Sequence, residues 1–83
     1  MANYSAERRD QVWDKGQTIR GKNPDLYRTD KEGNVMYKPS YGKMTGMGWE
    51  VDHSKPKSKG GTDHLNNLQP MQSHENRRKS DKY

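Results

Sequence analysis

The chain has 83 residues and no cysteine, so it supports one small domain at most and excludes both disulfides and thiolate zinc sites. Only 25% of its residues are hydrophobic, and a formal net charge of +5 suits an anionic partner such as nucleic acid. No apolar run approaches a membrane span and the N-terminus lacks a signal-peptide h-region, so a soluble cytoplasmic protein without membrane partners is expected.

The first half of the chain predicts a short helix followed by a β-hairpin. Ser5 can cap a helix over residues 6–15, and Gly16 would end it. Residues 26–29 and 35–38 have the composition of two short strands. The turn chemistry between them is supplied by Asp30, Gly33 and Asn34.

The second half predicts a strand, a loop, a second strand and a helix, reached through a Gly-punctuated connector. The connector and these elements are expected at residues 39–48, 49–51, 54–63, 67–71 and 73–83. Pro70 cannot donate a hydrogen bond to a sheet, so the second strand is expected to be edge-like or to end early. The fold class is therefore α+β, with a strand–loop–strand–helix unit in the last third.

So few apolar residues leave only a thin core, and domains this small usually need a further source of stability. Because cysteine is absent, we expect that source to be an oligomer or a metal held by oxygen and imidazole ligands. The residues expected in the core are Trp13, Ile19, Leu26, Tyr27, Val35, Tyr37, Trp49, Val51, Leu65, Leu68 and Met71.

An acidic and an imidazole side chain stand together where the first strand of this unit ends. Strand alternation puts Trp49 and Val51 on the core face and Glu50 and Asp52 on the other, while His53 begins the loop. In-line displacement at phosphorus needs the attacking water on one side and a stabilised leaving oxygen on the other. Asp52 can hold a divalent ion near the leaving oxygen, and a neutral His53 can take the proton from water. The end of one strand can therefore supply both groups that phosphodiester hydrolysis needs, a metal-binding carboxylate and a base.

Basic residues follow this strand end in the loop and in the terminal helix, for which Ser73 is the expected N-cap. Such side chains can contact DNA phosphates, and Gly60-Gly61 lets the loop turn sharply. A solvated loop and a helix with cations in its last turn explain the same pattern, and this alternative stays open. The candidates for phosphate contacts are Lys55, Lys57, Lys59, Arg77, Arg78 and Lys79.

Taken together, the unit resembles the HNH nuclease family and its ββα-metal fold. The matching motifs are Asp-His at 52–53, Asn-Leu-Gln at 67–69 and Asn-Arg-Arg-Lys-Ser-Asp at 76–81. The chain looks especially like small phage and bacterial HNH proteins and like the HNH domain of CRISPR effector nucleases. The resemblance covers residues 48–81 and implies a catalytic core over residues 49–81. The chain length favours a single domain over residues 1–83, in which residues 1–48 are expected to support that core.

The resemblance further implies a metal-dependent endonuclease that hydrolyses DNA phosphodiester bonds with a His general base and one divalent ion. His53 would be the base, Asp52 a metal ligand, and Asn67 would hold the loop so that His53 is oriented correctly. Asn76 takes the final ligand position, where many members have His, and His74 is the alternative ligand. Two oxygen donors suit Mg²⁺, with Mn²⁺ or another divalent ion as substitute, whereas an imidazole would favour Ni²⁺, Co²⁺ or Zn²⁺.

Two rival functions are weighed against cleavage. One is a catalytically silent DNA-binding module of the same fold, and the other is a structural zinc protein using His53, His64 and His74, whose spacing argues against it. The expected partner is DNA, mostly through its phosphates, and a homodimer or a larger phage or host complex in the host cytoplasm is the further expectation. Homing, packaging, restriction and toxin roles stay open.

Overall fold

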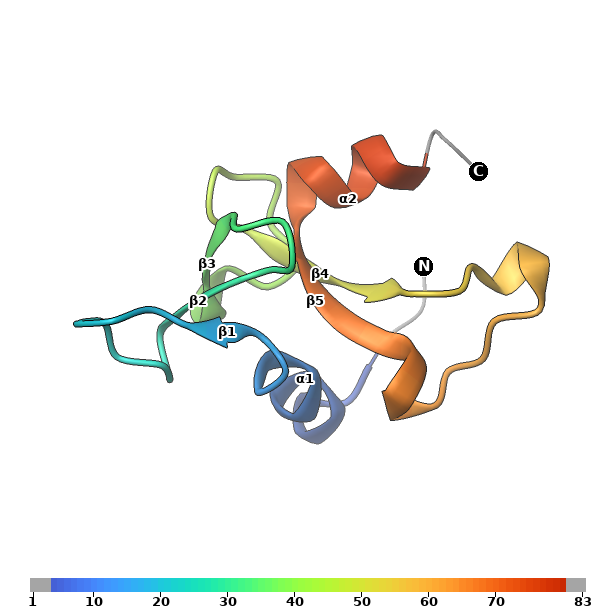
Figure 1. Ribbon diagram of the computed structural model, residues 1–83, viewed down its shortest axis with the longest axis horizontal. Helices are drawn as coiled ribbons and strands as arrows, with labels where there is room; N and C mark the ends of the chain where they lie inside the picture. The colour runs from blue at the N-terminus through green and yellow to red at the C-terminus, as the bar shows by residue number, and fades with distance from the viewer. Residues whose placement is uncertain (1–3, 81–83) are drawn as a thin grey trace.

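The computed structural model describes residues 4–80, and in this range two helices accompany two small antiparallel sheets (Figure 1). The α+β class predicted from the sequence is confirmed. The helices and strands are α1 (Ala6–Trp13), β1 (Gln17–Thr18), β2 (Tyr27–Thr29), β3 (Val35–Tyr37), β4 (Trp49–His53), β5 (Leu68–Gln72) and α2 (Ser73–Ser80). Three short 3₁₀ turns are η1 (Lys38–Ser40), η2 (Lys57–Lys59) and η3 (Leu65–Asn67). Within the described range, neither helix has the length and apolar character needed to cross a membrane.

Helix α1 begins where the sequence predicts. The Ser5 side chain accepts a hydrogen bond from the Arg8 backbone N–H at 3.1 Å, which satisfies one of the unpaired donors of the first turn. The helix ends at Trp13, earlier than predicted. The amides of Lys15 and Gly16 then bond to carbonyls three residues back, so the chain leaves the helix through a tight turn.

The predicted hairpin is present, and β1 adds a third strand to it that the sequence does not predict. One side-chain direction differs from the prediction. Met36 is fully buried, whereas Val35, which we expected in the core, is 41% exposed. Tyr37 is half-buried and packs its ring on Tyr27 across the strand pair. Because successive side chains of a strand alternate between faces, burying Met36 turns both of its neighbours away from the core.

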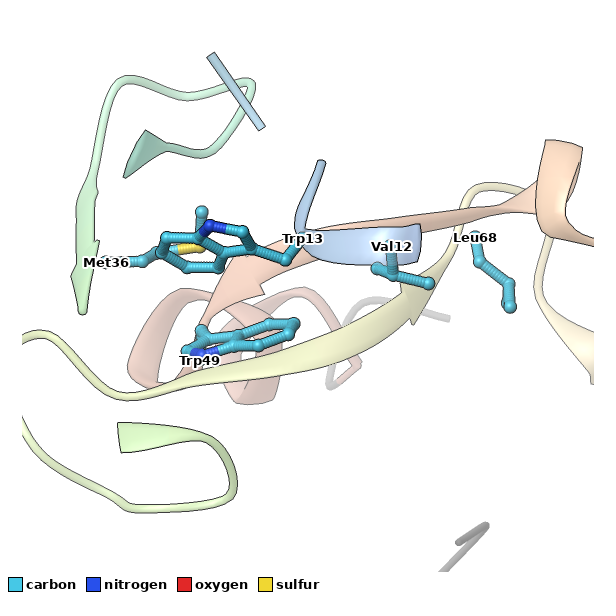
Figure 2. Close-up of a cluster of buried hydrophobic side chains, with 5 residues drawn as sticks. All are labelled: Val12, Trp13, Met36, Trp49 and Leu68. Atoms are coloured by element: carbon cyan, nitrogen blue, oxygen red, sulfur yellow. The ribbon is translucent and has the colours of Figure 1, made fainter. Parts of the chain in front are cut away.

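The core is a small cluster shared by α1, β3, β4 and β5. The rings of Trp13 and Trp49 lie 5.1 Å apart, and Met36 packs beside them (Figure 2). Each indole N–H reaches a backbone carbonyl at 2.9 Å, Trp13 that of Pro24 and Trp49 that of Lys38. The two indoles therefore bury large apolar surfaces without leaving a buried donor unpaired.

Not all of the predicted core residues are inside. Leu26 is exposed and Ile19 is only partly buried. Val12, which the prediction omitted, is fully buried beside Trp13.

Strands β4 and β5 form an antiparallel pair that runs from Trp49↔Gln72 to His53↔Leu68. The first strand is two residues longer than predicted and therefore includes both Asp52 and His53. Pro70 lies opposite Val51 in a two-stranded sheet, where each strand has a free edge. Helices α1 and α2 lie on opposite sides of this pair, so both of its faces are covered (Figure 1).

Helix α2 begins at Ser73, as predicted, but its N-cap differs from the prediction. The helix follows β5 without a linker, and the Gln72 side chain, rather than that of Ser73, accepts the Glu75 backbone N–H. Ser73 is fully buried and donates its hydroxyl to the Lys43 carbonyl. Because Ser73 already lies against the connector, its oxygen cannot turn back to cap the helix.

A buried carboxylate joins the two halves of the fold. Asp30 is 1% exposed, and its Oδ1 accepts the backbone N–H groups of Glu32 and Asn34 in the hairpin turn. Its Oδ2 accepts the Gln72 backbone N–H at 3.0 Å, at the junction of β5 and α2. The predicted turn residue therefore also fixes the position at which α2 begins.

Replacing Asp30 should destabilise the whole domain. Asp30→Ala removes the acceptor of three backbone N–H groups, of which that of Gln72 is in a buried hydrogen bond, and we expect a loss of about 3 kcal/mol in the free energy of unfolding. Urea unfolding at neutral pH measures this loss. Asp25→Ala is the matched control because Asp25 is exposed. Equal stability of the two variants would contradict the joining role of Asp30.

Candidate active site

Asp52 lies under α2, near the end of β4. Its side chain is about 9% exposed, and its Oδ2 accepts a hydrogen bond from Gln69 Nε2 at 2.7 Å. The same oxygen contacts Lys79 Nζ at 2.5 Å, in an ion pair with α2. Gln69 is the residue opposite Asp52 in the strand pair, so the hairpin register brings this amide to the carboxylate. A nearly buried carboxylate is thereby held between a neutral donor and a cation.

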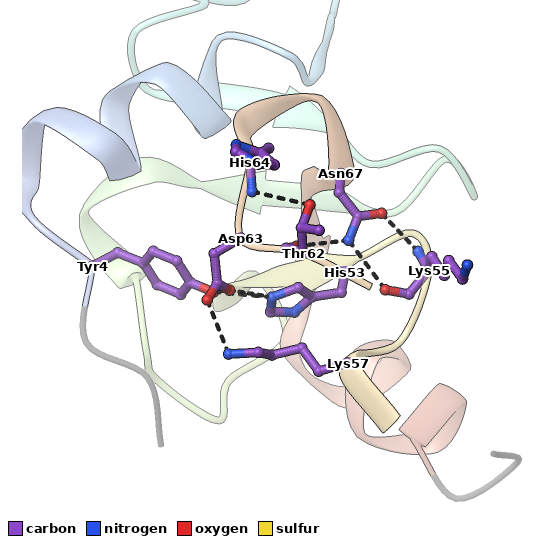
Figure 3. Close-up of polar contacts among 8 residues, drawn as sticks. All are labelled: Tyr4, His53, Lys55, Lys57, Thr62, Asp63, His64 and Asn67. Carbon is purple, nitrogen blue, oxygen red and sulfur yellow. Dashed lines mark hydrogen bonds and ion pairs between the residues drawn. The ribbon is translucent and has the colours of Figure 1, made fainter. Parts of the chain in front are cut away.

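His53 points to the opposite side of the strand and contacts different elements. Its Nε2 lies 2.7 Å from Asp63 Oδ1 and 3.4 Å from the hydroxyl of Tyr4 (Figure 3). Asp63 ends the polar loop, and Tyr4 precedes α1. The divergence of Asp52 and His53 expected from strand alternation is therefore what the fold produces.

Asn67 closes the loop that follows His53. Its Nδ2 donates to the carbonyls of Lys55 and Thr62 at 3.1 and 2.7 Å, and its Oδ1 accepts the Lys55 backbone N–H at 2.9 Å. One amide side chain thus binds both ends of the loop (Figure 3). Gly61 is required inside it, because a Cβ there would lie 1.8 Å from the Lys55 carbonyl oxygen.

The two alternative ligands on α2 lie in different surroundings. Asn76 is partly buried and donates its Nδ2 to Glu50 Oε1 at 3.0 Å, whereas His74 is exposed. Asn76 and Lys79 are three residues apart, so they share the helix face that covers β4. Asn76 is therefore on the side of α2 that meets the strand carrying Asp52.

Glu50 completes the set of groups between β4 and α2. Arg77 binds its carboxylate through Nε and an Nη atom, the latter at 3.0 Å. Burial raises the pKa of the Glu50 carboxyl, but the hydrogen bonds from Arg77 and Asn76 outweigh burial and bring the pKa below its usual value. Glu50 is therefore ionised at neutral pH.

The two groups that contact His53, Asp63 and Tyr4, have pKa values far from their usual ones. Hydrogen bonds from His53 and Lys57 lower the pKa of Asp63 to about 2. Burial, together with the neighbouring Asp63 charge, raises the pKa of Tyr4 to about 12. At neutral pH Asp63 is therefore an anion and Tyr4 a neutral hydroxyl that can donate to it.

Most of the predicted phosphate contacts are paired with carboxylates. Lys55 and Lys59 lie exposed in the loop. Four ion pairs join Lys57 to Asp63, Arg77 to Glu50, Arg78 to Glu75, and Lys79 to Asp52. Lys79 is the most enclosed of the four, with 17% of its side chain exposed.

The sequence reasoning did not identify three residues that contact the site: Gln69, Asp63 and Tyr4. The position of Gln69 could have been predicted, because it lies opposite Asp52 when the two predicted strands are paired. Asp63 ends the loop, and only its closure by Asn67 brings it back to His53. Tyr4 is 49 residues before His53 and carries no local signal.

The donors at β4 and α2 suit a hard divalent cation that retains other ligands. Within the described residues, no group of three or more His, Cys, Asp or Glu side chains is arranged to hold a metal ion. Asp52 and the Asn76 amide would supply oxygens only, and waters and phosphate oxygens would complete the shell. The Asp52 carboxylate binds the ammonium of Lys79 in this structure, so a divalent ion would replace that contact. In donor chemistry alone, the oxygens of Asp52 and Asn76 fit such an ion.

The arrangement is that of a ββα-metal unit. It consists of an antiparallel strand pair whose first strand ends in Asp-His, a loop closed by Asn, and a following helix. Comparison with protein-family models matches residues 39–82 to HNH endonuclease, over more than half of the chain, and the chain belongs to this family. The resemblance stated from the sequence is confirmed. No curated protein and no solved structure gives a match. HNH nucleases act on DNA and generally use a divalent metal ion.

Asn67→Ala should loosen the loop while the hairpin remains. Three hydrogen bonds to the loop backbone are lost, so the Lys55 amide should exchange with solvent about 10-fold faster or more. Hydrogen exchange followed by NMR measures this directly. Asn66→Ala is the matched control, since Asn66 is the exposed neighbour. Unchanged Lys55 exchange in Asn67→Ala would rule out the loop-closing role.

Proposed function

We propose that the protein is a metal-dependent endonuclease that hydrolyses DNA phosphodiester bonds, with His53 as general base and Asp52 as ligand of one divalent ion. One observation carries this proposal: two adjacent residues at the end of β4 face opposite sides, Asp52 toward α2 and His53 toward the loop. A scissile phosphate at this strand end can meet a base on one side and a carboxylate on the other.

The chemistry assigned to the protein groups is an in-line hydrolysis. His53 takes a proton from water as the new O–P bond forms, and the bond from phosphorus to O3′ breaks on the opposite side. The products are a 5′-phosphate and a 3′-hydroxyl, whose oxygen takes a proton from solvent. A bound divalent ion supplies charge stabilisation for the leaving and non-bridging oxygens. Asn67 keeps the loop closed, and so keeps His53 in place.

We assign Asn76 rather than His74 as the second protein ligand. What supports this choice is position, because Asn76 lies on the strand-facing side of α2 with Lys79, whereas His74 is exposed. Two oxygen ligands favour Mg²⁺, with Mn²⁺ as a substitute.

The rest of the proposal concerns binding and organisation. Residues 1–48 support the core of residues 49–81 within one domain, because Asp30 and the pair of tryptophans join the two parts. The protein binds DNA through its phosphates, largely without regard to base sequence. The proposed location is the cytoplasm. The side chains assigned to phosphates are Lys55, Lys57, Lys59, Arg77, Arg78 and Lys79.

A catalytically silent DNA-binding module is the second candidate. The observation that favours it is the ion pair of Lys79 with Asp52, because an ammonium neutralises this carboxylate without any metal. The two candidates differ in one measurement, since only an endonuclease cuts DNA.

Cleavage should depend on both the base and the ion. Supercoiled plasmid should be nicked with Mg²⁺ or Mn²⁺ and remain intact with EDTA. His53→Ala should lower the cleavage rate by about 10²–10⁴-fold, because general-base help is lost. His64→Ala is the matched control, since His64 is exposed and is not assigned to the site. Intact plasmid with every divalent ion would favour the silent module instead.

The ligand assignment predicts separate effects on ion binding. Asp52→Asn should abolish Mn²⁺ binding measured by calorimetry, and Asn76→Ala should weaken it at least about 10-fold, since each removes or reduces an oxygen ligand. His74→Ala should bind Mn²⁺ and cleave DNA much as the parent does. The reverse pattern, with loss in His74→Ala alone, would move the ligand to His74 and the metal preference toward Ni²⁺, Co²⁺ or Zn²⁺.

A further inference from the structure

Asp63 is the closest polar partner of His53, yet the proposed reaction gives it no task. It lies ten residues after His53 and places Oδ1 2.7 Å from Nε2, within the range of a charge-assisted hydrogen bond. An aspartate carboxylate is an anion at neutral pH, and Lys57 Nζ on its Oδ2 favours that charge, so Asp63 only accepts a hydrogen bond here. The proton of this contact therefore belongs to His53 Nε2.

This contact determines which ring nitrogen is basic. A neutral imidazole carries one N–H, and donating Nε2–H to a carboxylate leaves the lone pair on Nδ1. Within residues 4–80, no hydrogen bond occupies Nδ1, and that edge of the ring points away from Asp63 (Figure 3). The nitrogen free to take a proton is therefore Nδ1.

Asp63 is itself held in place from several directions. Lys57 Nζ binds its Oδ2 at 2.9 Å, and the Tyr4 hydroxyl donates to Oδ1 at 3.4 Å. Asn67 binds the carbonyl of Thr62, the preceding residue, at 2.7 Å. The carboxylate is thus oriented through the same loop that Asn67 closes, although half of its side chain is exposed.

We propose that Asp63 is a positioning residue for His53, holding the imidazole as the Nε2–H tautomer so that Nδ1 accepts the proton of the attacking water. This proposal rests on the proposed function. As the O–P bond forms and the bond to O3′ breaks, the water proton moves to Nδ1 and His53 becomes an imidazolium. The Asp63 anion then faces that positive charge across the hydrogen bond already present.

The tautomer can be measured without any nuclease activity. Long-range ¹H–¹⁵N NMR at alkaline pH, where free imidazole is neutral, should show His53 of the full chain mainly as the Nε2–H form. Asp63→Ala should shift the two ring nitrogens toward averaged tautomer values, whereas Asp25→Ala should leave them unchanged, because Asp25 is an exposed carboxylate elsewhere. A parent protein in the Nδ1–H form would overturn the proposal.

The kinetic effect should fall on kcat. Asp63→Ala should lower kcat about 10- to 100-fold because the base is misplaced, with KM for DNA and Mn²⁺ affinity near those of the parent. Asp63→Glu keeps the anion and should restore part of kcat, which a purely structural loss of the loop would not allow. A kcat equal to or above that of the parent in Asp63→Ala would reject the positioning role. Absence of cleavage by the parent itself would instead reject the proposed function.

Discussion

The buried carboxylate of Asp30 is the contact that holds the two halves of this small domain in register. It accepts backbone donors from its own hairpin turn and from Gln72, at the residue where β5 passes into α2. The position of α2 decides where Asn76 and Lys79 stand over β4. A chain without cysteine has no thiolate zinc site to fix such a junction, and here an internal hydrogen-bond network does so.

The period of a β-strand then separates the two groups of the proposed reaction. Adjacent residues of β4 face different layers, so Asp52 is enclosed under α2 while His53 lies beside the loop and Tyr4. Enclosure reduces hydration of the Asp52 carboxylate and strengthens its attraction for a cation. His53 needs access to water instead, and it lies where the hairpin opens into the loop. One local rule of backbone geometry therefore supplies two environments within a single dipeptide.

Local signals were sufficient for the order of the motifs and for every helix and strand except β1. The cap at Ser5 and the turn at Asp30 act within a few residues, so the sequence predicted them directly. The side-chain direction in β3 depended instead on tertiary packing, because a three-residue strand is too short for alternation to choose between Val35 and Met36. The prediction that Ser73 caps α2 was wrong for a related reason, because the Ser73 hydroxyl donates to the Lys43 carbonyl in the connector.

For the candidate site as well, the sequence indicated the residues near strand ends but not the contacts that depend on the folded loop. The motif placed Asp52, His53 and Asn67, because these residues lie at or beside strand ends that the sequence defines. The contact between Asp63 and His53 needs the loop to close, and closure depends on bonds from Asn67 to backbone atoms at both loop ends. No sequence period reports such a contact.

The charges of the site are better described as oriented pairs than as a simple positive surface. Lys57, Arg77 and Lys79 each bind a carboxylate, on the loop side or the helix side of β4. Such pairs add little stability where they are exposed, but they restrict long side chains to a few positions. A phosphate that replaces a carboxylate as partner meets a cation already oriented, so less side-chain entropy is lost on binding. In the proposed binding of DNA phosphates, the acids around the strand end would therefore prepare the basic groups for the anionic ligand, and the net charge of +5 would attract it from a distance.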